Sequence, residues 1–219
     1  MPIMISRLGW AWAALLVPLG AALWTFGEYV LHRFAMHELK GRGKLSSEHL
    51  EHHVRATWQF DPLIMFAWLG VILVGVFVWG PVAWVIGGPV AAASVAVGWM
   101  GGYAYYEYQH AQSHLRGPRS RYTRWLRRHH FHHHFGHPMA NHGVTTLIWD
   151  KAFGTFEAPT VVKVPRRMAP TWLVDAAGQI LPAYTDDYVL VGAAERDERL
   201  ADLDRVRAFA SLAPVEALA

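Results

Sequence analysis

The chain alternates between long uncharged stretches and short polar segments rich in histidine. Two stretches contain no Asp, Glu, Lys, Arg or His, one from Leu8 to Gly27 and one from Pro62 to Tyr106. A helix needs about 20 apolar residues, at about 1.5 Å per residue, to cross the hydrocarbon of a bilayer. The first stretch is long enough for one span and the second for two. The pattern therefore predicts membrane spans over residues 8–31, 63–86 and 89–110, with the choice between three and four spans left open.

Two other interpretations of the uncharged stretches are less favoured. A soluble domain rarely contains an uncharged run as long as the second stretch, which argues against a large buried core. A cleaved signal peptide would explain the first stretch. However, that stretch continues directly into the segment Glu28–His32, which carries the first histidine. We therefore expect an anchor that stays in the protein.

The polar segments also have helical patterns. Residues 37–61 read as a polar helical segment that Gly41 and Gly43 separate from the first span. Ser120 is placed to cap a helix that runs through His134.

The composition changes after the last histidines. Residues 160–219 contain scattered prolines and then an amphipathic helical pattern over 195–210. We predict an all-α fold, an integral-membrane helical bundle with a cytoplasmic helical cap that carries a histidine-rich di-metal site. The predicted domain covers residues 1–158, and residues 159–219 form a cytoplasmic C-terminal extension.

Basic residues mark the expected orientation in the membrane. The chain is 53% hydrophobic and 17% charged, and its net charge is +3. Its basic residues cluster between the first and second spans and again after the third. They are Lys40, Arg42, Lys44, Arg55, Arg116, Arg119, Arg121, Arg124, Arg127 and Arg128. The positive-inside rule makes that side cytoplasmic. An arginine run beside a membrane segment more often meets anionic lipid than nucleic acid, so no nucleic-acid partner is expected.

Fourteen histidines supply the candidate chemistry. Neutral imidazole is the commonest protein ligand for transition metals of intermediate softness. The chain has no cysteine, which excludes zinc sites and iron–sulfur clusters held by thiolates. Most of the histidines fall into four clusters, namely His32 and His37; His49, His52 and His53; His110 and His114; and His129, His130, His132, His133 and His134.

Helical spacing places several of these side chains on shared faces. Residues three and four apart lie on one face of a helix, as do the members of the second and third clusters and His130, His133 and His134. His32 and His37 lie about 140° apart on a regular α-helix. They meet at one site only where the helix ends or bends, or they serve different ions. Each cluster follows or precedes a predicted span on the cytoplasmic side, so four helices can bring ten histidines into one region.

Several groups are expected to support ligands or to face solvent. Carboxylates orient metal-bound imidazoles by accepting the other ring N–H. The candidate carboxylates are Glu28, Glu48, Glu51, Glu107 and Asp150, although each fits an ordinary helix-end or interface role equally well. His129 is a further candidate for a supporting role. His132, His137 and His142 are likewise expected outside the ligand set.

The clusters and their flanks resemble the fatty acid hydroxylase superfamily, the integral-membrane di-iron oxygenases that include sterol desaturases and fatty acid 2-hydroxylase. The segments that carry the resemblance are Glu28–His37, His49–His53, Gly101–His114, Leu126–Phe135 and Gly143–Thr155. They span about residues 20–157. The likeness is specific because four histidine boxes recur in order.

The resemblance implies ten ligands and no catalytic residue beyond the metal centre. They are His32, His37, His49, His52, His53, His110, His114, His130, His133 and His134. It also implies two irons, which zinc can replace in purified samples, with O2 as co-substrate. The chain departs from the family enzyme in lacking a fused cytochrome b5-like domain. We therefore expect electrons from a separate donor, either cytochrome b5-like or a ferredoxin with its reductase. The tail 160–219 is not covered by the likeness.

The expected function is hydroxylation of a C–H bond in a lipid drawn from the bilayer, most similar to attack on the acyl chain of a fatty acid or ceramide-like lipid. A lipid desaturase, or a carotenoid or sterol hydroxylase, would use the same metal site, and the sequence does not separate them. A metal transport or storage protein is the alternative outside enzymes. Transport needs ionisable groups inside the spans, and the stretch 62–106 has none.

Overall fold

The computed structural model describes residues 7–59, 62, 64–195 and 198–218. The chain forms two compact units. The first comprises Met1–Glu28 and Phe60–Tyr108, and the second comprises Tyr29–Gln59 and Gln109–Ala219. The second unit therefore contains every histidine of the chain.

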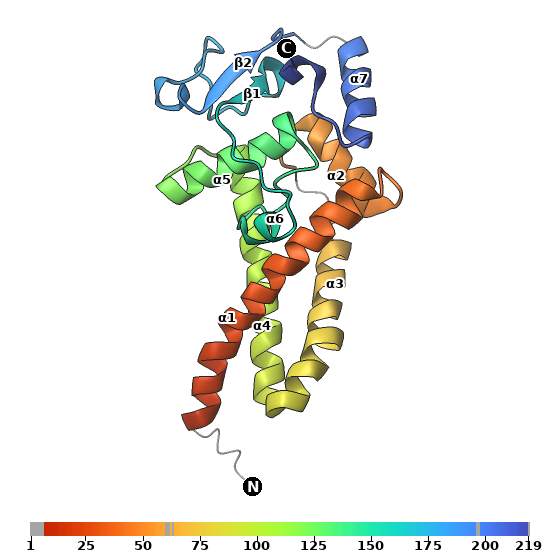
Figure 1. The fold of residues 1–219 in the computed structure, drawn as a ribbon, viewed down its shortest axis with the longest axis vertical. Helices are drawn as coiled ribbons and strands as arrows, with labels where there is room; N and C mark the ends of the chain where they lie inside the picture. Colours follow the sequence, from red (N-terminus) through yellow and green to blue (C-terminus); the bar gives the residue numbers. More distant parts are fainter. Residues whose placement is uncertain (1–6, 60–61, 63, 196–197, 219) are drawn as a thin grey trace. The chain divides into compact units, whose positions relative to one another are not determined.

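Apolar helices make up the first unit (Figure 1). α1 covers Arg7–Val30, of which the part up to Glu28 belongs to this unit. α3 covers Ile64–Val74 and continues as a π-helix, η2, over Gly75–Trp79. α4 covers Gly80–Leu115 and consists of two helices, because Gly87 and Gly88 have non-helical backbone angles. This break lies where the sequence predicts the second span to end; residue 63, the predicted start of that span, lies outside the described residues.

Close backbone approach and one tryptophan hold these helices together. A Cβ on Gly20 of α1 would collide with the carbonyl oxygen of Val95 in α4, so the missing side chain lets the two helices touch. Trp99 of α4 packs edge-on against Trp24 of α1, with ring centroids 5.1 Å apart. Its Nε1–H donates to the carbonyl oxygen of Val71 in α3 at 2.9 Å. Trp99 thus joins all three helices.

The outer surface of the first unit is apolar. Val85 and Ile86, next to the glycine break, are 87% and 80% exposed, and Phe66 is 71% exposed. Within the part of the chain that the structure describes, two helical segments are long and apolar enough to cross a membrane. They are Ala13–Glu38 and Phe66–Leu115, and the second contains the break. Contiguous apolar surface of this kind is typical of a face that meets lipid or another protein.

Helical segments that carry the histidines form one part of the second unit. Its π-helix η1 covers Leu31–Glu38 and follows α1 directly; α2 covers Lys44–Arg55. Positive φ angles of 81° at Gly41 and 89° at Gly43 separate these two helices, as the glycines predict. The end of α4 is followed by α5, Arg121–Phe131, by the π-helix η3, His132–Gly136, and by the short α6, Ile148–Ala152.

A short sheet in the C-terminal segment differs from the all-α prediction. β1, Val162–Pro165, pairs in parallel with β2, Tyr188–Val191, with Val162 opposite Tyr188. Short 3-10 helices lie at Arg166–Met168, Pro182–Tyr184 and Val215–Leu218. Val162 and Val164 are buried against Phe131 and Phe135. The strands were missed because their four-residue length gives little periodicity and their pairing is non-local.

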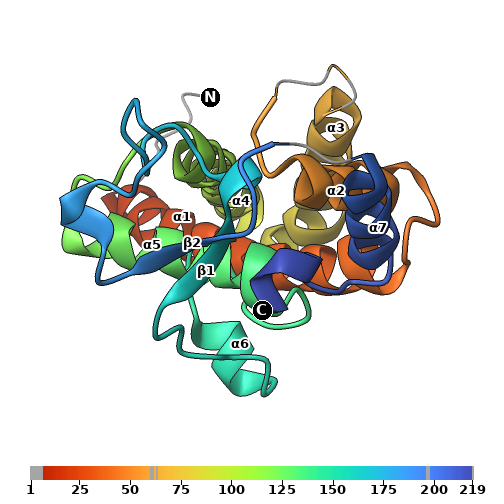
Figure 2. The same ribbon diagram turned by 90° about the horizontal axis from the view of Figure 1, so that it is seen from above.

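The last long helix, α7, covers Glu198–Phe209 and contacts α2 (Figure 2). It begins later than the predicted helix over 195–210, whose residues 196 and 197 lie outside the described residues. The C-terminal segment therefore shares one compact unit with the histidine helices. The predicted domain boundary at residue 158 stays a prediction.

Candidate metal centre

Ten histidines of the second unit gather into two groups of five. In each group the candidate ligand nitrogens all lie within 4.8 Å of one another. The first group is His32, His37, His49, His53 and His133, and the second is His52, His110, His114, His130 and His134. These are the ten histidines that the sequence singles out. Proximity in the sequence alone would have placed His52 in one group with His49 and His53, its neighbours on α2.

The π-helix η1 explains how His32 and His37 reach the same group. Its backbone hydrogen bonds join residues five apart rather than four, so residue 37 stacks above residue 32 instead of turning away from it. The two imidazole centroids lie 5.2 Å apart. The π-helix η3 follows α5 in the same way and carries His133 and His134. A regular α-helix would have left the first pair about 140° apart.

Nitrogen faces nitrogen inside each group. In the first group, Nε2 of His49 lies 2.9 Å from Nε2 of His37 and 3.1 Å from Nε2 of His32. In the second group, Nε2 of His114 lies 2.9 Å from Nε2 of His130. The groups adjoin each other, because the rings of His53 and His134 stack with centroids 4.1 Å apart.

Outer hydrogen bonds fix which nitrogen points inward. A backbone carbonyl only accepts, so a neutral imidazole beside one donates from Nδ1 and keeps its lone pair on Nε2. Four histidines donate Nδ1–H in this way: His32 to His142, His52 to Thr57, His114 to Ala56 and His133 to Ala140, at 2.5–3.1 Å. Their Nε2 lone pairs therefore converge on the interior of the groups.

Burial keeps these rings neutral. It lowers the pKa of five buried histidines outside the membrane-spanning segments well below the ordinary value, and neighbouring histidines lower it further. They are His49, His53, His130, His133 and His134. Burial also lowers the pKa of His52, to about 4, although a hydrogen bond to Thr57 opposes this. Neutral rings are the form that binds metal.

The donor set fits two transition-metal ions. Two ligand nitrogens about 2.0–2.1 Å from one ion lie at most about 4.2 Å apart. The nitrogens of each group lie within 4.8 Å of one another, so small rotations of the rings bring them to binding distance of a shared ion. Both ring nitrogens of His134 are buried and have no hydrogen-bond partner among the described residues. The same is true of Nδ1 of His130. Converging lone pairs without protons repel one another unless a cation lies between them. Imidazole suits iron, zinc, copper and nickel rather than calcium or magnesium.

Asp150 supports the first group through the backbone rather than by touching a ligand. Its carboxylate is fully buried and accepts hydrogen bonds at 2.8 Å from the backbone N–H groups of His142 and Gly143 and from the Thr155 hydroxyl. The His142 carbonyl in turn accepts from His32. The sequence predicts an outer position for His142, but no sequence pattern indicates that its backbone carbonyl orients a candidate ligand.

The remaining predicted support residues lie in different surroundings. His129 is buried 3.7 Å from Asp150 and stacks on Trp125. Glu48 forms an ion pair with Lys44 at 3.0 Å on a partly exposed face of α2, which is the ordinary helix role. Glu28 and Glu107 belong to the first unit.

The other two outer histidines share one carboxylate. Glu157 accepts from Nε2 of His132 at 2.9 Å and from Nδ1 of His137 at 2.6 Å. Both rings therefore bind a carboxylate outside the two groups.

Comparison with known proteins identifies the family to which the chain belongs. The profile of the fatty acid hydroxylase family matches residues 17–155, which include all ten histidines. The chain belongs to the fatty acid hydroxylase family. The match ends before β1, so the whole C-terminal extension, residues 159–219, lies outside it.

Individual relatives agree with this family. The dihydroceramide fatty acyl 2-hydroxylase FAH1 of Arabidopsis thaliana is 32% identical over 153 residues, which cover 69% of this chain and 63% of the relative. Human fatty acid 2-hydroxylase is 30% identical over 154 residues, which cover 63% of this chain and 38% of that protein. This chain thus spans under two thirds of the length of these relatives.

A solved structure is also similar. It is full-length Scs7p, with only the hydroxylase domain visible, and it aligns with a TM-score of 0.50 at 26% identity. The alignment covers 67% of this chain and 57% of that one. The visible hydroxylase domain of Scs7p is therefore similar in fold to about two thirds of this chain.

Proposed function

We propose that the chain is a membrane-bound, O2-dependent di-iron hydroxylase that attacks the acyl chain of a fatty acid or a ceramide-like lipid. The observation that carries the proposal is the pair of five-nitrogen groups in a chain of this family. The relatives described above are named as fatty acyl or fatty acid 2-hydroxylases, which favours hydroxylation over desaturation and an acyl chain over a carotenoid or sterol.

Each of the two histidine groups would bind one metal ion. His32, His37, His49, His53 and His133 would hold one ion, and His52, His110, His114, His130 and His134 the other. When bound, the two irons would supply the activation of O2 needed to break an unactivated C–H bond.

The chain's own residues supply orientation and a dry environment. The carbonyls of His142, Thr57, Ala56 and Ala140 hold four rings with their lone pairs inward. Nine of the ten histidines are buried, so bulk water does not compete at the site. Such outer contacts also raise the basicity of the ligands.

We further propose a membrane location and a separate electron donor. The apolar outer surface of the first unit suits lipid, and a lipid substrate would enter from the bilayer. The basic residues between the spans favour the cytoplasmic side for the metal centre. A cytochrome b5-like protein, or a ferredoxin with its reductase, would deliver the two electrons.

The test reconstitutes the iron-loaded chain in vesicles that contain ceramide, with a donor and its reductase, under isotopically labelled O2. We expect two ions per chain and one labelled oxygen atom on the acyl chain, measured by mass spectrometry. His130→Gln should reduce product by at least about 100-fold because it removes a ligand. His137→Gln is the matched control, since His137 is 52% exposed and contacts Glu157 instead.

Other outcomes would redirect the proposal. Loss of two hydrogens without gain of oxygen would indicate a desaturase. A variable and larger number of ions per chain, with no oxidised lipid, would indicate metal storage.

A further inference from the structure

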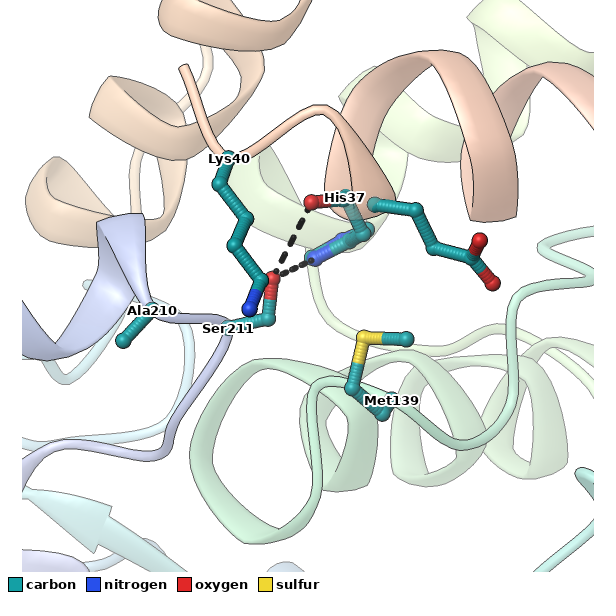
Figure 3. A pocket seen from close by; sticks show the side chains of 6 residues that line it. His37, Lys40, Met139, Ala210 and Ser211 are labelled. Atoms are coloured by element: carbon teal, nitrogen blue, oxygen red, sulfur yellow. Dashed lines mark hydrogen bonds between the residues drawn. The ribbon is translucent and has the colours of Figure 1, made fainter. Parts of the chain in front are cut away.

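Ser211 lies two residues after the end of α7, and its Oγ contacts two atoms of His37 (Figure 3). Its Oγ is 3.3 Å from the His37 carbonyl oxygen and 3.3 Å from His37 Nδ1. A serine hydroxyl has one proton, and the carbonyl oxygen can only accept it. Oγ is therefore the acceptor for Nδ1–H of His37. This arrangement leaves the Nε2 lone pair of a neutral His37 directed at His133, 3.1 Å away.

The group that orients the His37 ring comes from a different part of the chain than the carbonyls that orient the other four histidines. The four carbonyls described above belong to residues within the stretch that the family profile matches. Ser211 lies far beyond that stretch, 174 residues from His37 in sequence. One candidate ligand thus takes its orientation from the C-terminal extension.

The extension is held against the helices that carry the first group. Arg205 of α7 forms an ion pair with Glu51 of α2. The Phe209 ring occupies the space beside Gly41, where a Cβ would be 2.6 Å from the ring. Two contacts on different elements therefore set the position of Ser211, which is itself buried.

The backbone of Ser211 adopts a conformation that only a well-packed site maintains. Its φ is 56°, in the left-handed region that non-glycine residues rarely adopt. Hydrogen bonds from Ser211 N–H to Ala208 and from Leu212 N–H to Arg207, at 2.8 and 2.9 Å, hold this turn at the end of α7. The turn directs the hydroxyl at His37.

A cavity of about 290 Å³ adjoins this contact, lined by His37, Glu38, Lys40, Met139, Ala210 and Ser211 (Figure 3). It is polar enough and large enough for water. Without the hydroxyl, a mobile water would become the acceptor for Nδ1–H and would orient the ring less firmly.

We propose that Ser211 is a positioning residue for the metal ligand His37, and that the C-terminal extension thereby completes the first ion site. This inference rests on the metal centre proposed above. It assigns a role in that centre to a segment outside the family match.

The experiment separates the hydroxyl from the backbone strain with two opposite substitutions. Ser211→Gly removes the hydroxyl but accommodates the positive φ, whereas Ser211→Thr keeps a hydroxyl but strains a β-branched residue there. Thr185→Ala is the control, because Thr185 is an exposed hydroxyl in the same extension and donates to Pro182. The readouts are ions per chain, the rate of metal loss to a chelator, the absorption spectrum of the cobalt-loaded protein, and the unfolding temperature.

We expect metal retention to follow the hydroxyl and stability to follow the backbone. Ser211→Gly should unfold at the parent temperature or above it, yet lose metal from one site about tenfold faster or more, with an altered cobalt spectrum. Ser211→Thr should unfold at a lower temperature and retain metal like the parent. If Ser211→Thr does not fold, Ser211→Ala takes its place, and it should lose metal as fast as Ser211→Gly despite greater strain.

The inference is overturned if metal loss ranks with unfolding temperature, or if all variants keep two ions at the parent rate. The second result would leave the proposed metal centre intact. A parent protein without stoichiometric metal would instead overturn both.

Discussion

Single residues outside the two histidine groups orient the candidate ligands through hydrogen bonds. Asp150 is one such residue. Burial would raise its pKa, but the hydrogen bonds from the backbone N–H groups of His142 and Gly143 and from the Thr155 hydroxyl, together with the nearby rings of His129 and His142, outweigh burial and hold the pKa below the usual range. The charged form is thus the one that the fold stabilises, and it holds the segment whose carbonyl orients His32.

Replacing Asp150 with Asn should destabilise the protein. An amide has one acceptor oxygen and would set its NH2 against a backbone N–H of His142 or Gly143. The buried mismatch should lower the free energy of unfolding by about 1–3 kcal/mol. Chemical denaturation measures this change, and Asp202→Asn on the exposed face of α7 is the control. Equal midpoints for the two variants would contradict the structural role of Asp150.

At the scale of elements, the helices that present histidines depend on how they begin and how they are wound. α5 begins with a capping box, in which the Ser120 side chain accepts from Thr123 N–H and the Thr123 side chain accepts from Ser120 N–H. The sequence predicts this cap. It does not predict that the helix changes to π geometry at His132.

Ser120→Ala should reduce the free energy of unfolding by about 1 kcal/mol, because the Thr123 N–H loses its partner. Metal content should not change, since Ser120 is exposed at the far end of α5 from His130. Denaturant titration together with metal analysis tests both statements. A large loss of metal in this variant would mean that α5 frays as a whole.

What the sequence predicts here is local, and what it misses is non-local. Histidine spacing on α2 and α4, the Ser120 cap and the Gly87–Gly88 break depend on neighbours in the chain. The pairing of β1 with β2, the winding of η1 and the contact of Ser211 with His37 depend on residues brought together by folding. The gap of five between His32 and His37 was the one local sign of η1.

At the scale of the whole molecule, ten histidines make stability depend on protons and metal together. The pKa of the six rings outside the membrane-spanning segments is depressed, so the unfolded state binds more protons once the pH falls below about 6.5. Stability is therefore present above that pH and is lost as the pH falls toward the depressed values, which is about 4 for His52. Metal binding would add stability wherever the rings of the folded site are neutral, because the ions would bind only that form.

We expect chelator-treated protein to lose stability steadily between about pH 7 and pH 5, by up to about 1.4 kcal/mol per pH unit for each buried histidine that titrates in the unfolded chain. Metal-loaded protein should start from a higher unfolding temperature and fall more steeply, as protons displace the ions. Thermal unfolding followed across this range measures both curves. A flat profile for the chelator-treated protein would show that the rings are already protonated or exposed.

The distance in sequence between His37 and Ser211 also has a consequence for timing. A ribosome that adds about 5–20 residues per second makes Ser211 roughly 9–35 s after His37. Throughout that interval the nascent chain holds His37 without its serine. Loading of the proposed first ion site in its final geometry would therefore be a late event in biosynthesis, because it would follow the synthesis of a segment that lies outside the match to the family profile.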